Sequence, residues 1–258
     1  MFDNKSKARV MDNKAKSIVS QGADPAFFSC WDIHSYYGES YIVQGVSFDI
    51  REGEILALLG RNGAGKTSTL RSIARASDPQ VNHGEMWLDH QPLHEMEDYQ
   101  VAQIGVALVP EDRCIIGGLT VEENLKLAQI EGPIGWSIER IYEHFPRLGE
   151  RKDQDGITLS GGEQQMLAVA RALARDVKLL LLDEPYEGLA PVIVHEIEEI
   201  LLSIKKLGIT TIIVEQNAVA ALRLADRALI LDTGKIVFDG SAQEVLDDEV
   251  LRHQYLAI

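Results

Sequence analysis

The 258-residue sequence predicts an α/β fold with a largely parallel sheet, because apolar runs of strand length alternate with amphipathic helical segments. The run Leu179–Leu182 contains only leucine, which is typical of a central strand that is buried on both faces of a sheet. The segment Pro191–Lys206 begins with proline and repeats isoleucine and leucine at helical spacing. We therefore expect it to be a helix that covers one face of the sheet.

The first half of the chain shows the same alternation with one interruption. Strands are predicted at residues 27–35, 42–50, 55–59, 85–88 and 105–109, and a helix at residues 65–76. From Thr120 to about Glu150 the pattern becomes helical, and Thr120 forms a capping box with Glu123 at the start of this stretch. We interpret it as a helical lobe, at about residues 112–160, inserted into the α/β core.

After Lys178 the alternation resumes and continues almost to the end. Strands are predicted at residues 179–182, 210–214, 228–231 and 236–238, and helices at residues 191–206 and 218–225. The first 28 residues contain Lys, Asn and Ser and lack an apolar stretch of signal-peptide length. We expect residues 1–28 to be a disordered extension and residues 29–258 to form the folded domain.

Composition narrows the function classes. The net charge of −15 argues against a protein that wraps nucleic acid or lies on an anionic bilayer, since both need a basic face. Cys30 and Cys114 are far apart in the sequence, which indicates a reduced cytosolic protein with both thiols as small apolar fillers. The apolar runs are too short to span a bilayer, so the chain is expected to stay in the cytosol.

A glycine-rich segment points to a nucleotide. Residues 60–67 read Gly-Arg-Asn-Gly-Ala-Gly-Lys-Thr, the pattern of a phosphate-binding loop between a strand and a helix. Glycines let backbone N–H groups turn toward an anion, and the helix N-terminus adds partial positive charge. Lys66 is then expected to reach the β- and γ-phosphates, and the Thr67 hydroxyl to ligate Mg²⁺.

Two acidic residues follow the all-leucine strand. Asp183 and Glu184 are placed at its carboxyl end, where ligands bind in parallel sheets. Asp183 is suited to hold Mg²⁺, and Glu184 is suited to orient and deprotonate an attacking water. The alternative is that both carboxylates only cap the turn at Pro185.

A second anion-binding device is predicted at Leu159–Glu163. Ser160 and Glu163 form a capping box, so a helix begins here, with Gly161 and Gly162 in its first turn. Glycine in a helix costs stability, and we interpret its use as leaving backbone N–H groups open to an anion. The chain then has two phosphate-binding devices and one lysine loop, so the second device is expected to act on ATP held by another copy or a relative.

These three motifs, in this order, resemble the Walker A, signature and Walker B elements of an ABC-transporter ATP-binding subunit. The resemblance covers about residues 29–258. It implies a P-loop NTPase core with a largely parallel sheet, an antiparallel β subdomain near the N-terminus and an inserted helical subdomain. It also implies ATP and Mg²⁺ as cofactors and ATP hydrolysis as the activity.

Finer features are similar to the branched-chain amino acid transport family of the LivF type. Tyr37 matches the aromatic residue that stacks on the base in ABC ATPases. Most of those proteins have Gln and His where this chain has Glu111 and Gln216, and such exchanges are familiar in the LivF type. Glu111 either ligates the metal or its water, or it contacts the membrane partner.

The resemblance assigns residues to three roles. The catalytic residues are Glu184, Gln216 and Lys66. The metal ligands are Thr67, Asp183 and Glu111. The nucleotide-contacting residues are Tyr37, Gly60, Arg61, Asn62, Gly63, Ala64, Gly65, Lys66, Thr67, Ser68, Ser160, Gly161, Gly162 and Glu163.

The implied function is ATP hydrolysis that drives an importer of branched-chain amino acids or of urea, amides or aromatic acids. The implied partners are a second, non-identical ATP-binding subunit, two integral membrane permease subunits and, indirectly, an extracytoplasmic solute-binding protein. Such a protein is peripheral, at the cytoplasmic face of the inner membrane. The alternatives are a soluble ABC ATPase of cluster assembly or another non-transport role, a small-molecule kinase, which leaves Ser160–Glu163 unexplained, and a non-catalytic ATP-binding partner.

Overall fold

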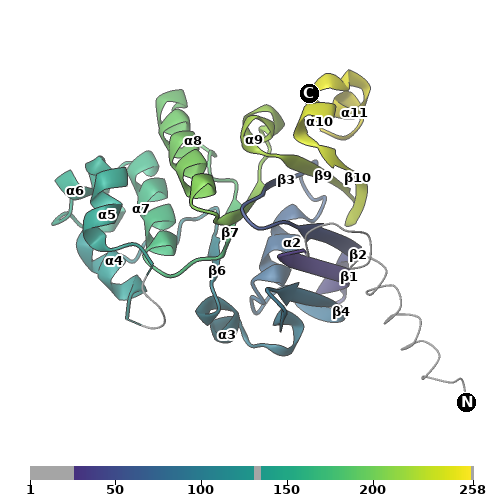
Figure 1. The fold of residues 1–258 in the computed structure, drawn as a ribbon, viewed down its shortest axis with the longest axis horizontal. Coiled ribbons are helices and arrows are strands. Elements are labelled where there is room, and N and C mark those ends of the chain that lie inside the picture. The colour runs from purple at the N-terminus through teal and green to yellow at the C-terminus, as the bar shows by residue number, and fades with distance from the viewer. Residues whose placement is uncertain (1–25, 131–134, 257–258) are drawn as a thin grey trace, which may run out of the picture.

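The computed structural model describes residues 26–130 and 135–256 (Figure 1). The strands are β1 (Phe28–Tyr37), β2 (Ser40–Ile50), β3 (Ile55–Leu59), β4 (Gln80–Leu88), β5 (Gln91–Pro92), β6 (Val106–Val109), β7 (Leu179–Asp183), β8 (Thr210–Val214), β9 (Arg227–Asp232) and β10 (Lys235–Ser241). The α-helices are α2 (Lys66–Ile73), α3 (Asp98–Gln103), α4 (Val121–Ala128), α5 (Ile138–His144), α6 (Pro146–Glu150), α7 (Gly161–Leu173), α8 (Pro191–Lys206), α9 (Ala218–Leu224), α10 (Ala242–Asp247) and α11 (Glu249–Tyr255), with single 3₁₀ turns at η1 (Leu93–Glu95) and η2 (Gly156–Thr158).

A six-stranded sheet forms the centre of the domain, in the order β10-β9-β3-β8-β7-β6. Every neighbouring pair in it is parallel except β10 with β9, so the prediction of a largely parallel sheet is confirmed. Because parallel strands end at the same edge, the loops after β3, β8, β7 and β6 lie next to one another. These are the loops that carry the predicted phosphate-binding and acidic residues.

Strand β7 is buried on both faces, as its sequence predicted. Leu180 and Leu182 belong to a core shared with the helical lobe and α8, whereas Leu179 and Leu181 belong to a second core around α2. A strand with no polar face can occupy only such an interior position. Its carboxyl end, at Asp183, is thereby held between two packed cores.

The predicted antiparallel subdomain is a four-stranded sheet in the order β2-β1-β4-β5. Helix α2 joins it to the central sheet, because Leu70 packs in one cluster with Phe28 of β1, Leu56 of β3 and Leu179 of β7. The phosphate-binding loop therefore lies where the two sheets meet.

The helical lobe lies at the opposite side of the domain from the antiparallel sheet, where Figure 1 shows α4–α7 grouped together. The predicted capping box at its start is present, since Thr120 Oγ1 accepts from Glu123 N at 3.2 Å and Glu123 Oε2 accepts from Thr120 N at 2.8 Å. Leu125 of α4, Phe145 beside α5 and Leu167 of α7 pack in one core with Leu180 of β7.

The structure differs from the sequence predictions at several boundaries. Strand β4 begins at Gln80, five residues before the predicted start, because its polar N-terminal half pairs with β1 across register shifts at Asp32–His34. Phe28, assigned to the extension, is the first residue of β1 and is fully buried. Residues 1–25 of the extension lie outside the described residues.

One sequence expectation about the cysteines was wrong. Cys30 is buried, as an apolar filler should be, but Cys114 is exposed in a loop with a φ of 44°. Its thiol donates to Asp112 Oδ1 at 3.0 Å, so a polar neighbour replaces the expected apolar packing. Within the described ranges, none of the helices has the length and apolar character that crossing a bilayer requires.

Candidate functional site

A pocket of about 410 Å³ opens where the loops after β3, β6, β7 and β8 meet β1 and β2. It brings together residues that are separated by up to about two thirds of the chain in sequence, and most of them belong to the motifs that were predicted to act together. Its lining consists of Tyr37, Ile42, Asn62, Gly63, Gly65, Lys66, Thr67, Ser68, Glu111, Glu184 and Gln216.

The phosphate-binding loop has a backbone that side chains would obstruct. Gly60 has a φ of 148°, and a Cβ there would lie 2.4 Å from the Leu231 carbonyl oxygen. Gly65, with a φ of 102°, precedes α2 in a left-handed conformation that favours glycine. The first N–H groups of α2 have no partner within the helix, so they are available to an anion at this point.

Lys66 is buried at the start of α2 and turns back over the loop. Its Nζ donates to the carbonyl oxygens of Gly60 at 3.0 Å and Arg61 at 3.4 Å. Burial lowers the pKa of Lys66, and the nearby carboxylates of Glu184 and Asp183 oppose that shift. The ammonium thus lies in the pocket with weak carbonyl partners that a phosphate oxygen can replace.

Thr67 and Asp183 form a direct link between the loop after β3 and the end of β7. Thr67 Oγ1 donates to Asp183 Oδ1 at 2.9 Å. Burial raises the pKa of Asp183, and the Thr67 hydrogen bond opposes that shift. The pair presents only oxygen ligands, which is the donor type that Mg²⁺ prefers.

Glu184 is held in a strained backbone conformation. Its φ is 47°, which is unusual for a residue other than glycine and is typical of functional sites. Its carboxylate Oε2 accepts from Gln216 Nε2 at 2.9 Å, and its backbone N–H donates to the Val214 carbonyl at 2.9 Å. Burial raises the pKa of Glu184, with the Gln216 hydrogen bond opposing, so this carboxylate is a stronger base than an exposed one.

Glu111 lies at the pocket edge and has a neighbour that sequence reasoning did not predict. Carboxylate oxygens of Glu111, Glu184 and Glu187 all lie within 4.8 Å of one another. The pKa of Glu111 is raised, first by a hydrogen bond with Glu187 and then by burial and the surrounding carboxylates. The Glu111 side chain therefore lines the pocket and also lies next to the loop after β7.

Two other predicted contacts are found in different surroundings. Tyr37 is the last residue of β1, is partly exposed and lines the pocket. The Arg61 side chain points away and donates to the Gln254 carbonyl of α11 at 3.0 Å, so only the Arg61 backbone faces Lys66. Gly60 and Ala64 support the loop without lining the pocket.

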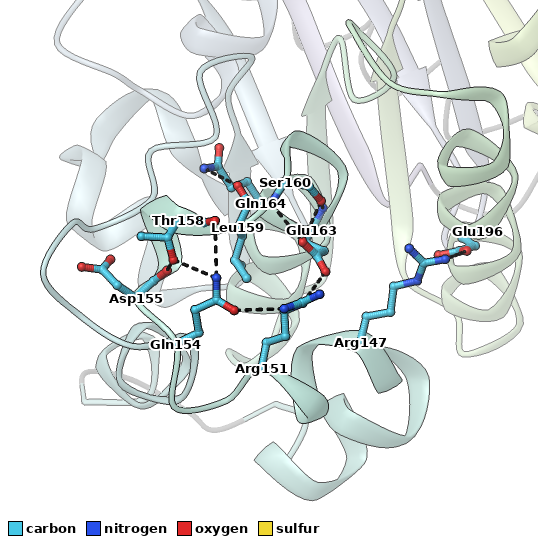
Figure 2. Close-up of polar contacts among 10 residues, drawn as sticks. All are labelled: Arg147, Arg151, Gln154, Asp155, Thr158, Leu159, Ser160, Glu163, Gln164 and Glu196. Carbon is cyan, nitrogen blue, oxygen red and sulfur yellow. Dashed lines mark hydrogen bonds and ion pairs between the residues drawn. The ribbon is translucent and has the colours of Figure 1, made fainter.

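The second device, at the start of α7, does not line this pocket. Ser160 is the N-cap as predicted, and Glu163 Oε2 accepts from Ser160 N at 2.9 Å and from Ser160 Oγ at 2.7 Å. Figure 2 shows Arg151 between Gln154 and Glu163, with its Nε donating to Glu163 Oε1 at 2.7 Å. Both Glu163 oxygens are thus used within the domain, and Glu163 shapes the helix start.

The glycines of this segment are not equivalent. A Cβ on Gly161 would lie 3.4 Å from an Arg113 guanidinium nitrogen, whereas a Cβ on Gly162 would lie 2.6 Å from Ile193 Cγ2 of α8. Anion binding was the use predicted for both glycines. For Gly162 that prediction is incomplete, because its packing against α8 already requires glycine.

Sequence reasoning missed three residues that organise the site. Glu215 accepts from Tyr186 N at 2.8 Å, Arg151 binds Glu163, and Arg113 donates to Gln165 Oε1 at 3.2 Å. A signal existed for Glu215, since it extends the buried run Thr210–Val214 with a carboxylate, as Asp183 does for β7. The two arginines lie in loops whose patterns carried no such signal.

Comparison with known proteins agrees with this geometry. Residues 43–187 match the family model described as ABC transporter. The chain is 40% identical over 227 residues to the high-affinity branched-chain amino acid transport ATP-binding protein BraG of Pseudomonas aeruginosa, covering 87% of this chain and 97% of that one. It is 34% identical over 221 residues to a probable branched-chain amino acid transport ATP-binding protein LivF of Archaeoglobus fulgidus, covering 84% and 93%.

A solved structure shares the fold. The dimeric structure of a bacterial ABC transporter cassette superposes with a TM-score of 0.73 at 25% identity, covering 83% of this chain and 98% of the other. The sequence matches, the fold and the pocket at the strand ends all agree. The chain therefore belongs to the ABC transporter family, as an ATP-binding subunit that hydrolyses ATP.

Proposed function

We propose that this chain is the ATPase subunit of an importer that moves branched-chain amino acids, or a related small solute, across the cytoplasmic membrane. The observation that carries this proposal is the 40% identity to BraG over 97% of that protein's length. The likeness is not confined to the nucleotide motifs, since it covers 87% of this chain.

In the proposed site, the pocket holds ATP with its base against Tyr37 and its phosphates along the loop of residues 60–67. Lys66 binds the β- and γ-phosphates, which replace its carbonyl partners. Glu184 orients and deprotonates the attacking water, and the raised pKa of its carboxyl suits a base. Gln216 holds that carboxylate through its amide N–H and senses the γ-phosphate.

The residues at the pocket floor fit Mg²⁺. Thr67 and Asp183 already lie in hydrogen-bond contact and offer oxygen ligands, and Glu111 lines the same pocket. When bound, Mg²⁺ would neutralise charge on the β- and γ-phosphates. Glu111 is assigned here as a further ligand of the metal or its water.

The segment Ser160–Glu163 is proposed to complete the site of a second ATP-binding subunit. It lies on the helical lobe and is absent from the pocket lining, so it cannot serve the ATP of its own chain in this arrangement. The N–H groups of Gly161 and Gly162, in the first turn of α7, would bind the γ-phosphate there. A non-identical relative is the proposed partner, with two permease subunits and, indirectly, a solute-binding protein. The chain would then be peripheral, at the cytoplasmic face of the inner membrane.

The test is reconstitution of this chain in lipid vesicles with the permease subunits and the second ATP-binding subunit that are proposed as its partners. We expect ATP-dependent uptake of labelled leucine, isoleucine or valine, and co-purification with integral membrane proteins in detergent. Replacement of Glu184 by Gln should reduce turnover by about 10²–10⁴-fold and leave ATP binding intact. A complex that contains soluble proteins only would contradict the transport role and favour a non-transport ABC ATPase. Near-normal turnover of Glu184→Gln would remove Glu184 from its assigned role.

A further inference from the structure

Glu215 is a buried carboxylate, 3% exposed, that follows β8 and to which the sequence motifs assign no role. It stands directly before Gln216, the proposed sensor, and two residues before Asn217, which caps α9. A buried carboxylate is costly unless it is hydrogen-bonded, so its partners indicate what it is used for.

The side chain of Glu215 connects two loops of the site. Its Oε1 accepts from the backbone N–H of Tyr186 at 2.8 Å, in the loop that follows Glu184. The backbone N–H groups of Gln216 and Asn217 also favour its charged form. Glu215 therefore holds the loop after β7 on one side and its own loop after β8 on the other.

A second link closes this arrangement into a ring. Gln216 Nε2 donates to Glu184 Oε2 at 2.9 Å, so the two loops are joined once through Glu215 and Tyr186 and once through Gln216 and Glu184. The first link fixes the separation of the loops. The second link is the one that aims the catalytic carboxylate.

The surroundings of Glu215 explain why this link can be rigid. With Tyr186 and Glu198, Glu215 lines a second cavity of about 520 Å³, which shares Glu184 and Gln216 with the nucleotide pocket. The strained φ of Glu184, at 47°, needs a neighbouring structure that holds it in place. The hydrogen bond from Tyr186 N–H to Glu215 is buried, and Tyr186 is two residues after Glu184. This hydrogen bond can therefore hold Glu184 in its strained conformation.

We infer that Glu215 is a positioning residue for ATP hydrolysis, which sets the geometry of Glu184 and Gln216 without touching the nucleotide. This inference rests on the proposed roles of those two residues. It explains why a carboxylate is kept in the core where an apolar side chain would be less costly. It also gives Glu215 an effect on kcat and none of its own on ATP binding.

The experiment compares full-length wild type with Glu215→Ala, Glu215→Gln and Glu198→Ala in steady-state ATP hydrolysis. Glu215→Ala removes the acceptor for Tyr186 N–H, and kcat should fall about 10²-fold while KM for ATP changes by less than about threefold. Glu215→Gln keeps an acceptor oxygen and should recover most of the turnover. Glu198 lines the same cavity, but its carboxylate bonds neither to the loop after β7 nor to the loop after β8. Glu198→Ala should therefore keep the kcat of wild type.

A double variant separates positioning from general damage to the fold. If Glu215 acts through Gln216, then Glu215→Ala combined with Gln216→Ala should be no slower than Gln216→Ala alone. Fully multiplicative losses, or wild-type kcat in Glu215→Ala, would overturn the inference. If Glu215→Ala does not fold, Glu215→Asp replaces it, because the shorter side chain keeps the charge and loses the contact with Tyr186.

Failure of this inference can be told apart from failure of the proposed function. Glu184→Gln is measured in the same series. If Glu184→Gln loses turnover and Glu215→Ala does not, only the positioning role is wrong. If Glu184→Gln retains turnover, the catalytic assignment itself is wrong, and the ring around it has no catalytic purpose.

Discussion

Replacing Gly162 by alanine should destabilise the domain, whereas the same change at Gly161 should not. The new Cβ at position 162 would lie 2.6 Å from Ile193 Cγ2 and 3.0 Å from Ile193 Cγ1, so α7 and α8 must separate or Ile193 must leave its position. Overpacking of this kind costs about 1–3 kcal/mol. In a chain of this size each kcal/mol lowers Tm by about 2–4 °C, so a fall of about 2–12 °C is expected.

Gly161→Ala is the matched control, one residue earlier in the same helical turn. Its Cβ meets only the end of the Arg113 side chain, at 3.4 Å, and that side chain can move. Alanine also favours the helix over glycine by about 0.5–1 kcal/mol, so Tm should stay or rise slightly. Thermal unfolding followed by circular dichroism measures both variants.

A double-mutant cycle assigns the loss to the contact itself. Ile193→Ala removes the two atoms that would lie at 2.6 and 3.0 Å from the new Cβ and leaves only Ile193 Cβ at 3.3 Å, so Gly162→Ala should cost less in that background, by about 1 kcal/mol or more. Additive effects, or a Gly162→Ala variant that melts with wild type, would refute the packing explanation. The purpose of glycine at position 162 would then be anion binding alone.

Three further predictions concern charge. Arg151→Met removes the guanidinium from Glu163, and because Arg151 is half exposed the substitution should lower the free energy of unfolding by about 1 kcal/mol or less. ATP-dependent pairing of subunits, measured by light scattering, should nevertheless weaken. Unchanged pairing would contradict a role for this ion pair in shaping the start of α7. Burial raises the pKa of Glu184 above 4.5, and a general base must be ionised, so kcat/KM for ATP should fall as the pH decreases, with a midpoint above 4.5. A midpoint at or below 4.5 would be inconsistent with Glu184 as the general base. Burial raises the pKa of Glu215 from 4.5 to about 7 in the folded state, so its ionisation opposes folding, and stability is lost as the pH rises through about 7. In urea titrations, Glu215→Gln should therefore gain stability relative to wild type as the pH is raised from about 5 to about 8. A stability difference that does not change with pH would contradict the shift.

The elements that the sequence predicted best are those whose local pattern and burial agree. Pro191–Lys206 and Thr210–Val214 have the predicted bounds, because a proline start and a run of β-branched residues are each strong local signals. Helices α10 and α11 were missed, since each spans seven residues or fewer and is stabilised by packing against α9 or by a single aspartate or serine cap. Strand β4 was predicted too short because its first half is polar and depends on pairing with β1.

The site was predictable where the residue type alone carries the chemistry. Lys66, Thr67, Asp183 and Glu184 lie as the motifs required, because a short motif on a strand end leaves little freedom. Contacts between loops could not be predicted, since they depend on the order of strands in the sheet. The Glu215–Tyr186 bond joins residues 29 positions apart, and it exists only because β7 and β8 are neighbours.

The charges around the pocket favour a site that works only with a bound cation. Among the residues that the structure describes, Lys66 is the one ammonium in the pocket lining, and the carboxylates of Asp183, Glu184 and Glu215 lie near it, with Glu111 at the pocket edge. A triphosphate brought into this setting would meet more negative than positive charge, in a partly buried place where screening is weak. Burial also raises the pKa of both Asp183 and Glu184, and the charge of Lys66 opposes the shift in each case. A divalent cation held by Thr67 and Asp183 beside the phosphates would relieve this imbalance, so ATP without Mg²⁺ is expected to bind weakly to this pocket.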